Sequence, residues 1–82
     1  MKYVVILSSY GVESPIILPE WMNHSDVIQP HHKVVSAGFC RFHIDQNETQ
    51  NVNCWGRSHT LNIGNRGTED EELLLRNNEF SA

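Results

Sequence analysis

The sequence has few of the features that stabilise very small domains. It contains two cysteines, Cys40 and Cys54, so at most one disulfide can form. A metal is not expected in its place, because no acid or cysteine lies at zinc-site spacing from the adjacent His31 and His32. A chain of 82 residues buries only about 60% of its unfolded surface, and self-association is the remaining way to enlarge the core. We therefore expect a homo-oligomer without metal or cofactor.

Long hydrophobic runs are also absent. The apolar run at residues 3–7 is followed at once by Ser8 and Ser9, and it is too short for the core of a signal peptide or for a membrane span. The sequence thus predicts a soluble, cytoplasmic protein with no membrane partner. Because thiols stay reduced in that compartment, we expect both cysteines to be free.

Positive charge is scarce. Six Lys and Arg residues stand against ten Asp and Glu residues, which gives a net charge of −4. Residues 68–82 carry all of this excess, so residues 1–67 are neutral overall. Proteins that bind duplex nucleic acid present a basic field to its phosphates. Polymeric nucleic acid is therefore not an expected partner, whereas a small anion needs only two or three arginines.

The β-prone segments that are present predict an α+β fold. We expect one domain over residues 1–82, built as a small antiparallel β-sheet or partial barrel of four to five strands with a C-terminal helix. Residues 2–8 and 13–18 should form a hairpin, in which Pro15 either makes the second strand an edge strand or lies on its outward side. Residues 33–44 and 52–63 should form a central hairpin across the polar connector 45–51.

Helical signals occur at two places. A single helical turn is predicted over residues 23–28, where Asn23 and Ser25 precede two apolar residues. A longer helix is predicted from Thr68, where Thr68 and Glu71 fit a capping box and three leucines follow at residues 73–75. The tail from about residue 77 to residue 82 should fray.

Alternation along the central hairpin sorts its side chains onto two faces. If Ile44 pairs with Val52, one face is small and apolar and should pack under the C-terminal helix. Its members are Gly38, Cys40, Phe42, Ile44, Val52, Cys54, Gly56 and Ser58, and the opposite face holds Phe39, Arg41, His43, Asn53, Trp55, Arg57 and His59. In this register the two cysteines are diagonal neighbours, which also argues against a disulfide.

The polar face would place Arg41 opposite Trp55 and Arg57 opposite Phe39. One interpretation is a solvated sheet face with cation–π pairs of about 0.5–1 kcal/mol. The other is a platform on which a planar base stacks while arginines bind phosphate. In an unbroken strand the apolar Leu61 would point to this same polar face. Either the face is partly buried, or a bulge near Gly56 reverses which face the following side chains point to.

The ligand interpretation assigns roles to eight residues. Aromatic rings would stack on bases, arginines would bind phosphates, and polar side chains nearby would add hydrogen bonds. The candidates are Phe39, Arg41, Trp55, Arg57, Ser58, His59, Thr60 and Arg66. No catalytic residue is assigned, since His43 and His59 have no nearby acid in a triad-like setting. A binding protein rather than an enzyme is expected.

Several segments resemble a family of short proteins encoded by tailed phages and prophages. They are KYVV at 2–5, ILP at 17–19, VVSAGFCR at 34–41, CWGRSHTLNI at 54–63 and RGTED at 66–70. The resemblance implies a phage protein of the host cytoplasm that evades host defence. One such function is that of an anti-CBASS sponge, which sequesters a cyclic dinucleotide immune signal without cleaving it. The alternative is an inhibitor of a host defence or nucleic-acid enzyme that acts through the acidic helix.

Overall fold

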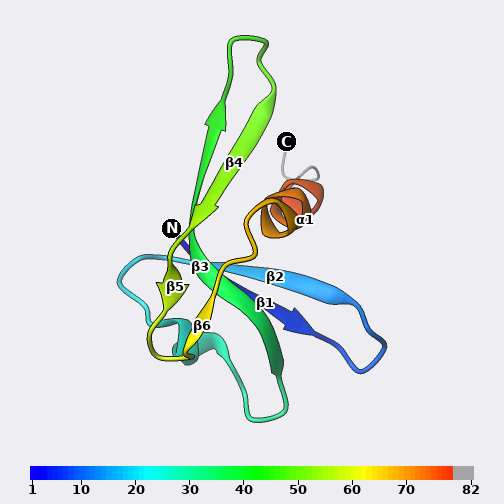
Figure 1. Ribbon diagram of the computed structural model, residues 1–82, viewed down its shortest axis with the longest axis vertical. Helices are drawn as coiled ribbons and strands as arrows, with labels where there is room; N and C mark the ends of the chain where they lie inside the picture. The colour runs from blue at the N-terminus through cyan, green and yellow to red at the C-terminus, as the bar shows by residue number, and fades with distance from the viewer. Residues whose placement is uncertain (79–82) are drawn as a thin grey trace.

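Four antiparallel strands form the main sheet of the computed structural model, which describes residues 1–78 (Figure 1). Their order across the sheet is β2-β1-β3-β4, with β1 at Lys2–Leu7, β2 at Glu13–Leu18, β3 at Lys33–Ile44 and β4 at Gln50–Trp55. A second, two-stranded sheet joins β5 at Arg57–Ser58 to β6 at Ile63–Gly64. The 3-10 helix η1 covers His24–Val27, and helix α1 covers Thr68–Asn78. The predicted α+β fold is confirmed. Within residues 1–78 no helix has the length and apolar character needed to span a membrane.

The first hairpin forms as the sequence predicts. Apolar, β-branched residues favour β1, and the turn that follows is closed by the Ser8 hydroxyl, which accepts hydrogen bonds from the N–H groups of Tyr10 and Val12. Gly11 takes a positive φ of 81° in this turn. Strand β2 lies at the edge of the sheet, where the missing N–H of Pro15 is tolerated.

The register of the β3–β4 hairpin differs from the expected one by two residues. Ile44 pairs with Gln50 rather than Val52, because the turn is shorter than the polar run suggested. The Asp45 carboxylate closes it by accepting hydrogen bonds from the N–H groups of Asn47 and Thr49. A shift of two residues preserves the two faces of the hairpin but changes every cross-strand partner.

Gly56 ends the predicted long strand at 52–63. Its φ of 74° turns the chain out of the main sheet, so a break replaces the bulge that the alternation suggested. Beyond it the chain runs through β5, a tight turn and β6. Gly56 also lies against the Phe39 ring, on the polar face and not on the apolar face to which alternation assigned it.

The two faces of the main sheet are covered by different elements. Helix α1 covers one face, where Leu73 and Leu74 pack on Tyr3, Cys40 and Val52. The other face is covered by η1 and by the β5–β6 region, around Val4, Leu18 and Ala37. The packing of the leucine helix on the apolar face of the central hairpin is therefore confirmed. Ile44 is an exception at 70% exposure, because the tip of the β3–β4 hairpin projects beyond the helix (Figure 1).

A buried carboxylate attaches the start of α1 to the sheet. Asp70 is 0% exposed and accepts hydrogen bonds from Tyr3 Oη at 2.5 Å, Ser36 Oγ at 2.9 Å, Arg66 N at 2.9 Å and Arg66 Nε at 2.8 Å. The predicted capping box between Thr68 and Glu71 does not form. The Glu71 carboxylate instead accepts a hydrogen bond from the N–H of Cys54 on β4. The helix extends through Asn78, which is the second residue of the tail that was predicted to fray. Residues 79–82 lie outside the described residues.

Candidate ligand-binding site

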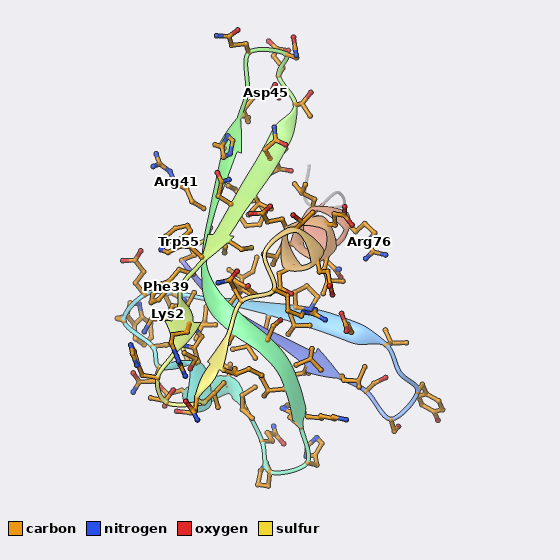
Figure 2. The ribbon with its side chains drawn as sticks, viewed as in Figure 1. Lys2, Phe39, Arg41, Asp45, Trp55 and Arg76 are labelled. Carbon is orange, nitrogen blue, oxygen red and sulfur yellow. The ribbon has the colours of Figure 1, made fainter. Side chains whose placement is uncertain are left out.

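A cation and two aromatic rings form a row across three strands on the sheet face opposite α1. Lys2 on β1 pairs with Phe39 on β3, and Phe39 pairs with Trp55 on β4. Directly paired residues point to the same face of a sheet. Figure 2 shows Arg41, Trp55, Phe39 and Lys2 following one another along the side of the sheet away from α1. The sheet thus presents one continuous strip of aromatic and basic side chains.

The two rings of this strip are stacked. The ring centroids of Phe39 and Trp55 are 6.2 Å apart with an interplanar angle of 22°, and the His24 and Phe39 rings form a T-shaped pair with their centroids 5.8 Å apart. His24 is held in place because its Nε2 lies 2.8 Å from the carbonyl oxygen of Gly38 and so donates to it. Phe39 is therefore supported on both sides, while Trp55 remains 49% exposed and offers aromatic surface to solvent.

A small pocket of about 130 Å³ lies beside Phe39. Four of the eight predicted ligand residues line it, together with three others. The lining residues are Lys2, Asn23, His24, Phe39, Arg57, His59 and Thr60. Lysine, guanidinium, amide and hydroxyl groups from four different segments converge here, and no carboxylate is among them. The lining therefore combines two permanent cations, Lys2 and Arg57, with uncharged polar groups.

The basic groups around this pocket have no acidic partner. Among the ion pairs of residues 1–78, the cation is either the N-terminal amine or Arg66, so Lys2, Arg41 and Arg57 form none. Arg57 instead donates to the side-chain oxygen of Asn62 at 2.5 Å, and Lys2 Nζ donates to the carbonyl oxygen of Met22 at 2.7 Å. Lys2 and Arg57 are thus each held by a neutral acceptor, and no carboxylate of the described residues pairs with them.

The alternating arginine and aromatic pairs expected from the sequence do not occur. Arg41 lies opposite Asn53 instead of Trp55, and Phe39 lies opposite Trp55 instead of Arg57. The result is an aromatic pair with Arg41 on one side and the pocket on the other. Arg41 still belongs to the same face, because a shift of two residues keeps the alternation.

Two of the predicted ligand residues do not contribute to this surface. Ser58 is fully buried, where its hydroxyl accepts from the N–H of Leu61 and lies 3.3 Å from the hydroxyl of Thr60. These contacts hold the turn in which Thr60 lies.

Arg66 is the second of these residues. It binds Glu13 in a bidentate ion pair and also binds Asp70, and these contacts raise the pKa of its guanidinium. Arg66 therefore attaches the start of α1 to β2 and does not line the pocket.

Three lining residues were missed by sequence reasoning. Lys2 and His24 join the site through contacts with β3, and Asn23 begins the helical turn next to them. Pairing between β1 and β3 joins residues 37 positions apart in the case of Lys2 and Phe39. No local pattern indicates such a contact, although the alternation of β1 does place Lys2 and Val4 on one face.

A larger hollow of about 510 Å³ lies between the η1 loop and the β5–β6 turn. Its lining is mainly apolar and includes Ile28, Val34, Leu61 and Ile63. His32 is the single titratable side chain that lines it. The lining of this larger hollow contains no Lys or Arg side chain, whereas the smaller pocket beside Phe39 contains both Lys2 and Arg57.

Comparison with known proteins gives no relative on which to base an assignment. No family model matches the chain, and neither the curated proteins nor the solved structures contain a significant match.

Proposed function

We propose that this protein binds a small anionic aromatic ligand, such as a nucleotide, on the strip formed by Lys2, Phe39 and Trp55. The observation that carries the proposal is the pocket beside Phe39, which has two permanent cations and no carboxylate in its lining and opens next to a stacked aromatic pair. A nucleotide combines a planar base with a phosphate, and these two surfaces match its two parts.

The size of the pocket determines which part of a ligand enters it. At about 130 Å³ it is smaller than the roughly 300–1,000 Å³ of sites that enclose drug-sized molecules. A phosphate group fits against Lys2 and Arg57, and the base remains outside against Trp55. Stacking on an aromatic ring contributes about 1–3 kcal/mol per base, and hydrogen bonds to charged groups contribute about 1.5–3 kcal/mol.

The function within this class is that of a sponge, which holds the ligand and releases it unchanged. The resemblance to short phage proteins favours a cyclic dinucleotide immune signal as the ligand and evasion of host defence as the role. Because Trp55 is open to solvent in one copy of the chain, a second copy placed over it would enclose the base. The homo-oligomer expected from chain length supplies that copy in the host cytoplasm.

The alternative function, inhibition of an enzyme through the acidic helix, has less surface available to it. Asp70 is buried, and Glu71 is bonded to the backbone of β4. Two exposed acids, Glu69 and Glu72, remain in the opening turns of α1 to imitate a nucleic acid.

Calorimetry against inorganic phosphate, a nucleoside, a nucleoside monophosphate and a cyclic dinucleotide tests the proposal. We expect saturable binding of the nucleotides, recovery of the ligand intact, and at least tenfold weaker binding for Trp55→Ala and for Arg57→Gln. The matched controls are Tyr10→Ala in the first hairpin turn and Arg76→Gln on α1, which are exposed and lie away from the strip. They should bind like the wild type.

Thermal melts of the same variants separate binding from folding. Phe42→Ala removes a partly buried ring that packs on the α1 core and should cost about 3 kcal/mol of stability, the low end for a buried aromatic. Trp55→Ala should cost clearly less. Unchanged nucleotide affinity in Trp55→Ala and Arg57→Gln, or a Trp55→Ala protein as unstable as Phe42→Ala, would refute the ligand site and favour the interaction function.

A further inference from the structure

The corrected register brings the two cysteines face to face. Cys40 on β3 pairs directly with Cys54 on β4, whereas the sequence-based register made them diagonal neighbours. Both thiols are free in the structure, as expected. Both side chains belong to the core between the sheet and α1, so they project from the same face of the hairpin.

Backbone hydrogen bonds identify the kind of pair that they form. The N–H of Cys40 donates to the carbonyl oxygen of Met1, and the carbonyl of Cys40 accepts from the amine of Met1, so both backbone groups of Cys40 point toward β1. The N–H of Cys54 points the other way, to the carboxylate of Glu71. No β3–β4 backbone hydrogen bond therefore joins the two cysteines, and they form a non-hydrogen-bonded pair.

This kind of pair has the spacing that a disulfide needs. In an antiparallel sheet the Cα atoms of a non-hydrogen-bonded pair are about 4.5 Å apart, closer than in a hydrogen-bonded pair. Disulfides span Cα separations of about 4.4–6.8 Å. The two thiols can therefore be joined with little movement of the backbone, and the diagonal arrangement that argued against a bond is absent.

The surroundings of the two thiols set the order of reaction. Cys40 is 0% exposed, while Cys54 is partly exposed and is the thiol that a reagent reaches first. Burial raises the pKa of the Cys54 thiol to about 12 and also raises the pKa of Cys40. Since the thiolate is the nucleophile, the reaction is slow at neutral pH and accelerates as pH rises.

We propose that Cys40 and Cys54 are an oxidative modification site, which forms a reversible cross-strand disulfide with a low-molecular-weight disulfide as the oxidant. The Cys54 thiolate, having lost its proton to solvent, attacks the small disulfide and releases one small thiolate. The Cys40 thiol then loses its proton and its sulfur attacks Sγ of Cys54, which releases the second small thiolate. The protein loses two hydrogens, and the small disulfide is reduced to two thiols.

The bond has a defined place in the fold. Cys40 directly follows Phe39, and Cys54 directly precedes Trp55. The disulfide thus connects β3 to β4 at the pair next to Phe39 and Trp55, on the opposite face of the sheet from the stacked rings and just before Gly56 turns the chain away. It also spans the turn of the β3–β4 hairpin, so the oxidised form should melt at a higher temperature than the reduced form.

Incubation in buffers of oxidised and reduced glutathione tests the proposal without any other ligand. One incubation starts from the folded reduced protein and a second starts from the unfolded reduced protein. Slow entry of glutathione into the folded core then cannot conceal a disulfide that is stable at equilibrium. We expect a single chain with neither thiol open to alkylation after denaturation, a mass lower by two hydrogens, full reversal by dithiothreitol, and a faster reaction at higher pH from the folded side.

The matched controls are Cys54→Ser, which leaves one thiol, and the double variant Cys54→Ser with Asn53→Cys. The double variant moves the thiol by one residue to the opposite, exposed face of β4. Neither should form an intramolecular bond. A wild-type protein that keeps two alkylatable thiols, ends as a stable glutathione adduct, or forms disulfide-linked dimers from both starting states would overturn the proposal.

Discussion

Replacement of Asp70 by alanine tests the interaction that holds α1 on the sheet. The Asp70 carboxylate accepts four hydrogen bonds in a site closed to solvent, from Tyr3, Ser36 and two groups of Arg66. Its removal leaves the two hydroxyl groups without their acceptor and deprives the Arg66 guanidinium of one of its carboxylates. The perturbation is therefore larger than the loss of one contact.

The expected loss of stability follows from this arrangement. Removal of one partner from a buried ion pair costs about 3–5 kcal/mol, and we expect Asp70→Ala to fall in this range. A domain of 82 residues has about 4–12 kcal/mol in total, at roughly 0.05–0.15 kcal/mol per residue. Tyr3→Phe removes one donor and leaves the carboxylate with three, so it should cost about 1–2 kcal/mol.

The same carboxylate predicts a pH dependence. Burial alone would raise the pKa of Asp70, but hydrogen bonds from Tyr3, the Arg66 N–H and Ser36 outweigh burial and hold the pKa below its usual value. A group whose pKa is lower in the folded state stabilises the protein above its unfolded pKa, about 3.9 for Asp, and this stability is lost as pH falls further. The difference between wild type and Asp70→Asn should be constant near neutral pH and should narrow below about pH 4.

Urea unfolding monitored by circular dichroism at pH 7 and pH 3 measures these differences. Glu72→Ala is the control, because Glu72 is an exposed acid on the same helix and its loss should change stability by less than about 0.5 kcal/mol. If the free energy of unfolding of Asp70→Ala lies within 1 kcal/mol of the wild-type value at pH 7, the buried network does not hold the helix and the reasoning fails.

Two further predictions concern the turn at Gly56 and the assembly. Gly56→Ala places a Cβ 2.8 Å from the Phe39 ring at a φ of 74°, so a thermal melt should show a loss of about 1–3 kcal/mol. Gly11→Ala at φ 81° meets no atom within 4 Å and should lose less, and equal losses would mean that contact with Phe39 does not matter. Light scattering at micromolar concentration should report a dimer or larger species. A monomer with a cooperative melt would remove the idea of a ligand enclosed between copies.

Local features of the sequence were enough for much of the fold. Alternation and turn residues located the first hairpin, the edge strand with Pro15 and the two faces of the central hairpin, because these depend on neighbouring residues. The cap-like run at Thr68 located the start of α1, but Glu71 bonds to β4 instead of closing the predicted capping box. The helix was predictable even though its tertiary contacts were not.

The candidate site was predictable only in part. Phe39 and Trp55 lie together because they share a face of the hairpin, and Arg57, His59 and Thr60 reach the same pocket because they follow Trp55 closely in the chain. Arg66 was assigned to the site as a basic residue in a glycine-containing loop. Its carboxylate partner Glu13 lies 53 residues away, and nothing in the local sequence reveals that pairing.

In the paired part of the central hairpin, which ends at Trp55, the sequence by itself determined which side chains share a face, since the direction of a side chain in an unbroken strand depends only on the parity of its position. The tertiary structure decided which of them meet across strands. A compact turn at Asp45 moved the hairpin register by two residues, which exchanged arginine–aromatic pairs for a stacked Phe39–Trp55 pair and set Cys40 opposite Cys54. The pairing of β1 with β3 added Lys2. Both outcomes depend on turn closure and long-range packing, which local residue patterns do not encode.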